Sequence, residues 1–140
     1  MIGKIQIAID CHDPHALNTF WAETVGYEKE DHHDMIEQLL ASGQLPEEET
    51  VTLGGRRAFR TAAACVDPDG NGPRLLFQMV PEGKTVKDRI HLDLHVGDRR
   101  EAVIASCLER GATKLWDGQQ GPQTWVTLAD PEGNEFCVSE

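Results

Sequence analysis

Alternation of hydrophobic and polar positions marks the strands of this chain. Between residues 4 and 10, three isoleucines at every second position alternate with polar or small residues, which is the period of a strand with one buried face. Similar apolar stretches, bounded by turn-forming residues, predict six further strands. They cover residues 59–66, 74–80, 90–96, 113–116, 124–128 and 135–139.

Two helices with defined ends are predicted between these strands. Asp13 precedes a proline, which is typical of a helix N-cap followed by a first-turn proline, and Gly26 suits the left-handed residue that ends a helix. In the second helix, Asp98 with Glu101 resembles a capping box, and Gly111 is the predicted end. Apolar residues three and four positions apart predict one buried stripe on each helix.

The chain carries one template twice. Both copies have intervals of 7 and 13 positions between a strand residue, a helix cap and a terminal glycine. These residues are Gln6, Asp13 and Gly26 in the first copy and His91, Asp98 and Gly111 in the second. Each copy later reaches an Asp-Pro turn, at 67–71 and at 130–134, and closes with an apolar strand. The repeat predicts a single domain over residues 1–140, with similar modules at about 1–83 and 88–140.

An acidic segment, residues 28–50, interrupts the first copy. The stretch between the first helix and the first Asp-Pro turn is 22 residues longer than its counterpart. Helical spacing at 35–40 predicts a short surface helix and a loop, and Gly54-Gly55 predicts a turn. His32 and His33 are expected in an exposed, flexible loop, and capture of a stray metal ion by them is the less favoured alternative.

Each predicted helix covers the apolar face of its own sheet, so the opposite faces are polar or mixed. If these faces turn toward each other, they form a cup. Because side chains alternate along a strand, the pattern assigns particular residues to the cup. They are Gln6, Ala8, Asp10, Leu76, Gln78, Val80, His91, Asp93, His95, Glu135, Cys137 and Ser139.

Composition and charge narrow the classes of partner. The net charge is −11, and such a surface repels phosphate backbones and anionic lipids, so neither nucleic acid nor a membrane is expected as a partner. No apolar run approaches the ~18 residues of a membrane span, and the N-terminal residues lack the apolar region of a secretory signal. We therefore expect a cytoplasmic protein. Its four separated cysteines are expected to be small core residues, namely Cys11, Cys65, Cys107 and Cys137.

Several stretches together resemble the vicinal oxygen chelate superfamily, which includes glyoxalases, bleomycin resistance proteins and extradiol dioxygenases. Within it, the chain is most similar to the bacterial glyoxalase-like domain proteins. The stretches are DCHDP at 10–14, FW at 20–21, GY at 26–27, LFQMVPE at 76–82, KDRIHLDL at 87–94 and ADPEGNEFCV at 129–138. The resemblance implies an α+β fold of two pseudo-symmetric βαβββ modules, whose eight strands form a cupped sheet with the helices outside. It also implies frequent homodimers.

Metal-using members of that superfamily take ligands from the first, fourth, fifth and eighth strands. Carried over by position, these sites are Gln6, Gln78, His91 and Cys137. The set holds one strong nitrogen ligand and no carboxylate, so a hard dication would lack negative ligands. Metal-dependent chemistry is therefore disfavoured, and a divalent metal ion is kept as the alternative to no cofactor. The preferred interpretation is that His91 and the glutamines hydrogen-bond each other or a ligand. Asp93 or Glu135 would supply a carboxylate ligand to this site only if the strand register differs from the one predicted here.

Two hypotheses for catalysis concern the same face. His91, His95 and Asp93 are candidates for an acid–base pair, although a solvated or structurally bonded histidine is the favoured interpretation. Cys137 as a nucleophile would need a neighbouring base and a lowered pKa, and this hypothesis is disfavoured.

Trp125 and Phe59 either form walls of the predicted pocket or only pack in the core, and the second interpretation is favoured. The pocket allows three functions. The first is a lyase or isomerase-type enzyme that acts on a small oxygenated metabolite. The second is a non-catalytic binder that sequesters an antibiotic or a metabolite, as bleomycin resistance proteins do. The third is a structural dimer with a vestigial cleft, against which the polar cup argues. We expect a glyoxalase-like small-molecule pocket protein and leave its catalytic status open.

Overall fold

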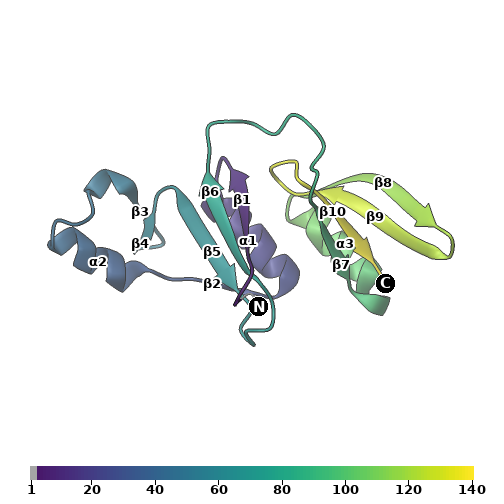
Figure 1. The fold of residues 1–140 in the computed structure, drawn as a ribbon, viewed down its shortest axis with the longest axis horizontal. Helices are drawn as coiled ribbons and strands as arrows, with labels where there is room; N and C mark the ends of the chain where they lie inside the picture. The colour runs from purple at the N-terminus through teal and green to yellow at the C-terminus, as the bar shows by residue number, and fades with distance from the viewer. Residues whose placement is uncertain (1–2) are drawn as a thin grey trace. The chain divides into compact units, whose positions relative to one another are not determined.

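The computed structural model describes residues 3–140 and has a mixed α and β architecture, as predicted. Met1 and Ile2, which belong to the N-terminal stretch considered above, lie outside the described residues. The chain divides between Pro81 and Glu82 into two compact units. Each unit contains a four-stranded sheet with a helix against one face (Figure 1).

The first unit, up to Pro81, follows the predicted order of strand, helix and three strands around an insertion. Its sheet has the order β1-β6-β5-β2, in which β1 and β6 are parallel and the other pairs are antiparallel. The elements are β1 (Gln6–Cys11), α1 (Pro14–Val25), β2 (Glu28–Lys29), β5 (Ala62–Val66) and β6 (Arg74–Met79). The predicted ends of α1 are confirmed: Asp13 accepts a hydrogen bond from the backbone N–H of Ala16, and Gly26 has a φ of 73°.

The insertion is more ordered than predicted. The expected short helix is present as α2 (His33–Ala41), but the expected loop contains a 3-10 turn (Glu47–Glu49) and a hairpin of β3 (Thr50–Leu53) and β4 (Arg56–Phe59). The single strand predicted over 59–66 is therefore wrong. Its beginning, Phe59, pairs with Thr50 in the hairpin, whereas the stretch from Ala62 pairs with β6 in the main sheet.

The two histidines of this segment are not in a flexible loop, which corrects the expectation. The ring nitrogen Nδ1 of His33, the first residue of α2, accepts a hydrogen bond from the backbone N–H of Arg57 at 2.8 Å. The Nε2 atom of His32 lies 3.1 Å from a carboxylate oxygen of Glu30. These contacts tie α2 to β4 and to the end of β2.

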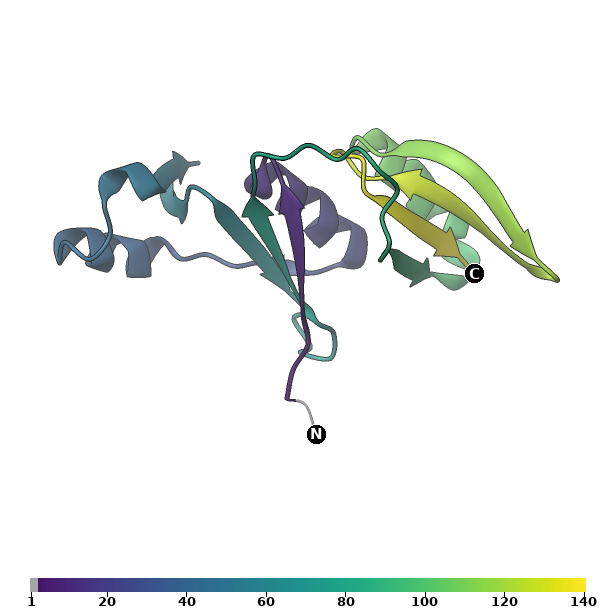
Figure 2. The ribbon, with the colours of Figure 1, turned by 45° about the horizontal axis from the view of Figure 1, so that its top comes forward.

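The second unit, from Glu82 onward, repeats the architecture without an insertion. Its sheet has the order β7-β10-β9-β8, and β8 and β9 form a long curved hairpin (Figure 2). The elements are β7 (Leu92–His95), α3 (Arg100–Glu109), β8 (Thr113–Gln120), β9 (Gln123–Ala129) and β10 (Glu135–Ser139). The capping box predicted at Asp98 is wrong. Gly97, with a φ of 61°, opens a 3-10 turn over Gly97–Arg99, so α3 begins only at Arg100 and has no side-chain cap.

The predicted assignment of strand faces is confirmed in both units. In the first, Leu75 and Phe77 of β6 are buried on the side of α1, while Gln78 is exposed. In the second, Phe136 and Val138 of β10 are fully buried, and the side chains between them lie on the other face. The joining of both sheets into one eight-stranded cup stays a prediction. No helix within residues 3–140 is long and apolar enough to cross a membrane.

Candidate functional site

The polar face of the second sheet encloses a hollow of about 590 Å³. Side chains from all four strands of this sheet line it, and those from β7 and β10 were assigned to the polar face by the alternation of the sequence. The strand residues are Asp93, His95, Trp116, Gln120, Gln123, Thr124, Trp125, Thr127, Glu135, Cys137 and Ser139. Register places them in rows, and one row runs across the sheet from Asp93 through Cys137 and Thr127 to Trp116. The hollow therefore has a polar edge at β7 and an aromatic edge at β8.

A hydrogen bond between His91 and Asp93 forms the polar edge. The two atoms, Nδ1 of His91 and Oδ1 of Asp93, lie 2.8 Å apart. Because an ionised carboxylate only accepts, Nδ1 donates and the lone pair of the neutral ring is on Nε2. Nε2 has no hydrogen-bond partner within residues 3–140. His95, the second histidine of this strand, is held by the hydroxyl of Ser139, 2.8 Å from its Nδ1.

Cys137 completes a compact group of donor atoms with this pair. It stands opposite Asp93 in the parallel pairing of β7 and β10, and one donor atom each from His91, Asp93 and Cys137 lie within 4.8 Å of one another. We call this group the His91–Asp93–Cys137 cluster. Burial raises the pKa of the Cys137 thiol and the charge of Asp93 raises it further, although the hydrogen bond between Cys137 and Thr127 opposes both. The thiol is thus protonated at neutral pH, which argues against a nucleophilic role.

Two tryptophans line the aromatic side of the hollow. Trp125 is half-buried on β9 and lines the hollow, whereas the favoured prediction for this residue was packing alone. Trp116 was not predicted, because the sequence analysis assigned no face to its strand. A bulge between Lys114 and Trp116 shifts the register of β8 against β9. The extra residue, Leu115, reverses the alternation, so that Trp116 faces the hollow. No sequence signal marked this bulge, and Gln120 and Gln123 were missed because the predicted strands stopped short of them.

The other predicted pocket residues belong to the first unit. The side-chain oxygen of Gln6 accepts a hydrogen bond from Arg74 at 2.6 Å, and Gln78 pairs with Asp10 at the other end of β1. Four residues of strand, ~13 Å, separate their positions, so the two amides do not bond each other, which corrects that part of the prediction. Phe59 ends β4 and lines a separate recess between α1, β5 and the insertion hairpin. The convergence of Gln6 and Gln78 with His91 stays a prediction.

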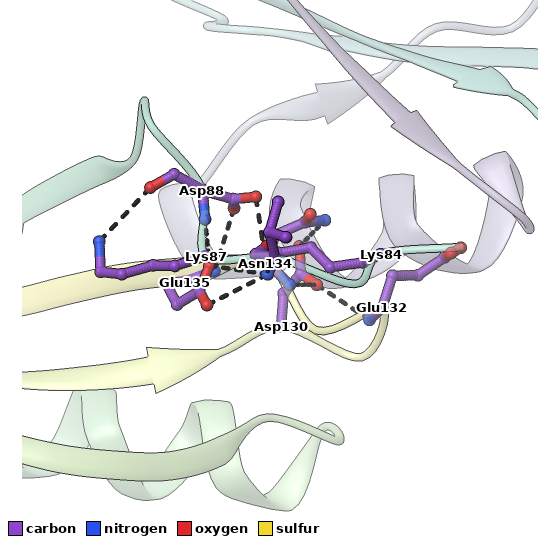
Figure 3. A network of polar contacts seen from close by, with 8 residues as sticks. Lys84, Lys87, Asp88, Asp130, Glu132, Asn134 and Glu135 are labelled. Carbon is purple, nitrogen blue, oxygen red and sulfur yellow. Dashed lines mark hydrogen bonds and ion pairs between the residues drawn. The ribbon is translucent and has the colours of Figure 1, made fainter. Parts of the chain in front are cut away.

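A network of charged groups fixes the segment that leads into the hollow. The carboxylate of Glu135 accepts hydrogen bonds from Lys84 and from the backbone N–H of Asp88, and the Glu135 backbone N–H donates to the Asp88 carboxylate (Figure 3). Burial would raise the pKa of Glu135, but these donors together lower it to about 2. Burial raises the pKa of Asp88, with the charge of Glu135 adding to the effect and Lys84 opposing it. The network holds residues 84–88 against the start of β10.

This network predicts a contribution of Glu135 to stability that acid removes. Because the folded-state pKa of Glu135 is lowered from 4.5 to about 2, its stabilisation is complete above about 4.5 and is lost as the pH falls toward 2. Asp88, with a raised pKa, acts in the opposite direction. We expect Glu135→Gln to flatten the pH dependence of the free energy of unfolding in this window, measured by urea denaturation. Glu109→Gln, an exposed matched control, should leave the slope unchanged; equal slopes in both variants would contradict the assignment.

Comparison with known proteins agrees with the fold. A family model described as a glyoxalase-like domain matches residues 6–139, which is nearly the whole chain. No curated protein sequence matches the chain.

Several solved structures share the architecture at low identity. Fosfomycin resistance protein FosX from Listeria monocytogenes, complexed with Mn(II) and 1S,2S-dihydroxypropylphosphonic acid, has 9% identity and a TM-score of 0.64 over 99% of this chain and 90% of that chain. A bleomycin-binding protein from Streptomyces verticillus, complexed with copper(II)-bleomycin, has 16% identity and a TM-score of 0.55 over 99% and 96%. A glyoxalase/bleomycin resistance protein/dioxygenase family enzyme from Burkholderia phytofirmans has 14% identity and a TM-score of 0.60 over 95% and 94%. At these identities the likeness concerns the fold alone.

Proposed function

Because the chain belongs to the family of glyoxalase-like domains, we propose that it binds a small oxygenated organic molecule in the hollow of its second sheet. The observation that carries this proposal is the His91–Asp93 hydrogen bond at one edge of a hollow whose other edge is aromatic. An apolar part of the ligand would contact Trp116 and Trp125, and its carbonyl or hydroxyl oxygens would face β7 and β10. Such a combination of apolar walls and a few polar groups is typical of small-molecule sites.

The chemistry that this arrangement supports is proton transfer, as in a lyase or an isomerase. Asp93 fixes the tautomer of His91, so that Nε2 can take a proton from a carbon next to a carbonyl group. The electron pair of the broken C–H bond would move to the carbonyl oxygen. The ammonium group of Lys87, which also lines the hollow, would stabilise the resulting oxyanion. Where the reacting carbon also carries a hydroxyl group, transfer of the hydroxyl proton to this oxyanion and return of the abstracted proton to the former carbonyl carbon would complete an isomerisation.

The same residues are of the types that can bind a divalent metal ion. The His91–Asp93–Cys137 cluster offers one nitrogen, one carboxylate oxygen and one sulfur, a set suited to Zn²⁺ rather than to Mg²⁺. A bound metal would polarise a carbonyl oxygen of the ligand. The raised pKa of Cys137 opposes this use, because the thiol must lose its proton to bind a metal. Elemental analysis of untagged protein is the test, since stoichiometric zinc that is lost in His91→Ala would establish the site.

Binding without turnover is the second candidate function. It is favoured by the two tryptophans, because they supply apolar contact area and take no part in proton transfer. In this case the protein would sequester its ligand, and His91 and Asp93 would only hydrogen-bond it. The proposal also includes the homodimer expected from the resemblance, which sedimentation equilibrium tests, and a cytoplasmic location.

One probe can test the pocket and separate the two functions. α-Hydroxyacetophenone carries an aromatic ring and a CH₂ group between a carbonyl and a hydroxyl. In ¹⁵N-labelled protein it should shift the indole N–H signals of Trp116 and Trp125. The signal of Trp21, which is fully buried on α1, is the internal control and should not move. Unchanged signals at both hollow tryptophans would refute the pocket.

Catalysis is tested by exchange of the CH₂ protons of the same probe for deuterium in D₂O. We expect the wild-type protein to accelerate exchange over buffer, and His91→Ala to lower the rate at least about a hundredfold, the usual range for a general base. Asp93→Asn should act in the same direction through the tautomer of His91. Binding without acceleration would reject the enzyme and leave the sequestering protein.

A further inference from the structure

Gly118 of β8 stands directly opposite Trp125 of β9, in the row that continues through Ser139 to His95. The indole of Trp125 occupies the space above this glycine. A Cβ atom at position 118 would overlap Cε2 and Nε1 of the indole and would lie 2.5 Å from Cζ2. These atoms belong to the body of a rigid ring, so the overlap can be relieved only if the indole moves.

The backbone gives no reason for a glycine at this position. Gly118 lies inside a long strand and, unlike the glycine of the following turn, Gly121 with a φ of 57°, is not in the left-handed region. A glycine inside a strand weakens it, and its usual explanation is the close approach of another group. The group that approaches here is the wall of the hollow.

We infer that Gly118 is a specificity-determining residue, which sets the width of the hollow by letting the Trp125 indole lie back against β8. This inference rests on the proposed small-molecule function and names its ligand class: molecules with a broad apolar ring system beside a hydroxyl or carbonyl oxygen. Any side chain at position 118 pushes the indole away from β8. The hollow then admits a single ring more readily than two fused rings.

Phenol and 2-naphthol form a matched pair of probes, because both carry one neutral hydroxyl and differ only by a fused ring. We expect Gly118→Ala to weaken 2-naphthol binding at least tenfold and phenol binding less than threefold, measured by titration of the tryptophan fluorescence. Gly3→Ala is the control, since a Cβ there meets no atom within 4 Å and the backbone is not left-handed. It should change neither affinity.

A double mutant separates the proposed contact from general damage. In the Trp125→Ala background, Gly118→Ala should not change the affinity for either probe any further. The double mutant should fold even if the single variant Gly118→Ala does not. Wild-type protein that binds neither probe would reject the proposed function. If the wild-type protein binds 2-naphthol, two results would reject the role of Gly118 alone. One is equal binding of 2-naphthol by Gly118→Ala, and the other is an effect of Gly118→Ala that persists in the Trp125→Ala background.

Discussion

Phe136→Ala is expected to lower the free energy of unfolding by about 4 kcal/mol, the middle of the range for removal of a buried phenylalanine ring. Phe136 is fully buried on β10, between Leu92 of β7 and Leu128 of β9. Strand β10 is central in its sheet and packs against α3, so the neighbours on both sides are held in place and cannot fill the cavity. Urea denaturation with extrapolation to water measures the change.

Phe59→Ala is the matched control for this loss. Phe59 is half-buried at the end of β4, and its exposed ring surface leaves less to lose, so about 1 kcal/mol is expected. Phe136 also precedes Cys137, so the core substitution should loosen the His91–Asp93–Cys137 cluster as well. Equal losses in the two variants would show that the centre of the second sheet is not the main apolar core of its unit.

The sequence predicted the faces of the strands well because alternation needs only a correct strand and no knowledge of its neighbours. Ile7 and Gln6 of β1, or Val138 and Cys137 of β10, separate to opposite faces in any regular strand. The prediction was poor where the chain departs from regularity. The bulge at Leu115 and the break after Phe59 both depend on how a strand pairs with its neighbour, which the alternation within a single strand does not record.

The hydrogen bond between His91 and Asp93 was left open by the sequence for a related reason. Two residues on one strand stand ~7 Å apart at the backbone, which makes direct bonding of their side chains uncertain. In the structure β7 begins only at Leu92, so His91 lies outside the pleat and its ring reaches Asp93. The approach of Cys137 follows from the parallel pairing of β7 and β10, which the residues alone did not predict.

Asp130→Ala is expected to lower the free energy of unfolding by about 3 kcal/mol, which is more than the cost of Asp67→Ala. The two aspartates begin the repeated turns and have the same role. The carboxylate of Asp130 accepts hydrogen bonds from the backbone of Glu132 and from both the backbone and the side chain of Asn134. Asp67 accepts three from backbone N–H groups, those of Asp69, Asn71 and Gly72.

Burial separates the two turns. Asp130 is 3% exposed, so the donors that it satisfies would lose their partner where water cannot readily replace it, and an unsatisfied buried donor costs about 1–3 kcal/mol. Asp67 is only half-buried, water can reach its donors, and Asp67→Ala should cost about 1 kcal/mol. The Asp130 turn also sets the start of β10, and its loss should weaken binding of α-hydroxyacetophenone. Urea denaturation of both variants gives the comparison, and an equal or larger loss in Asp67→Ala would show that burial does not govern the strength of these turns.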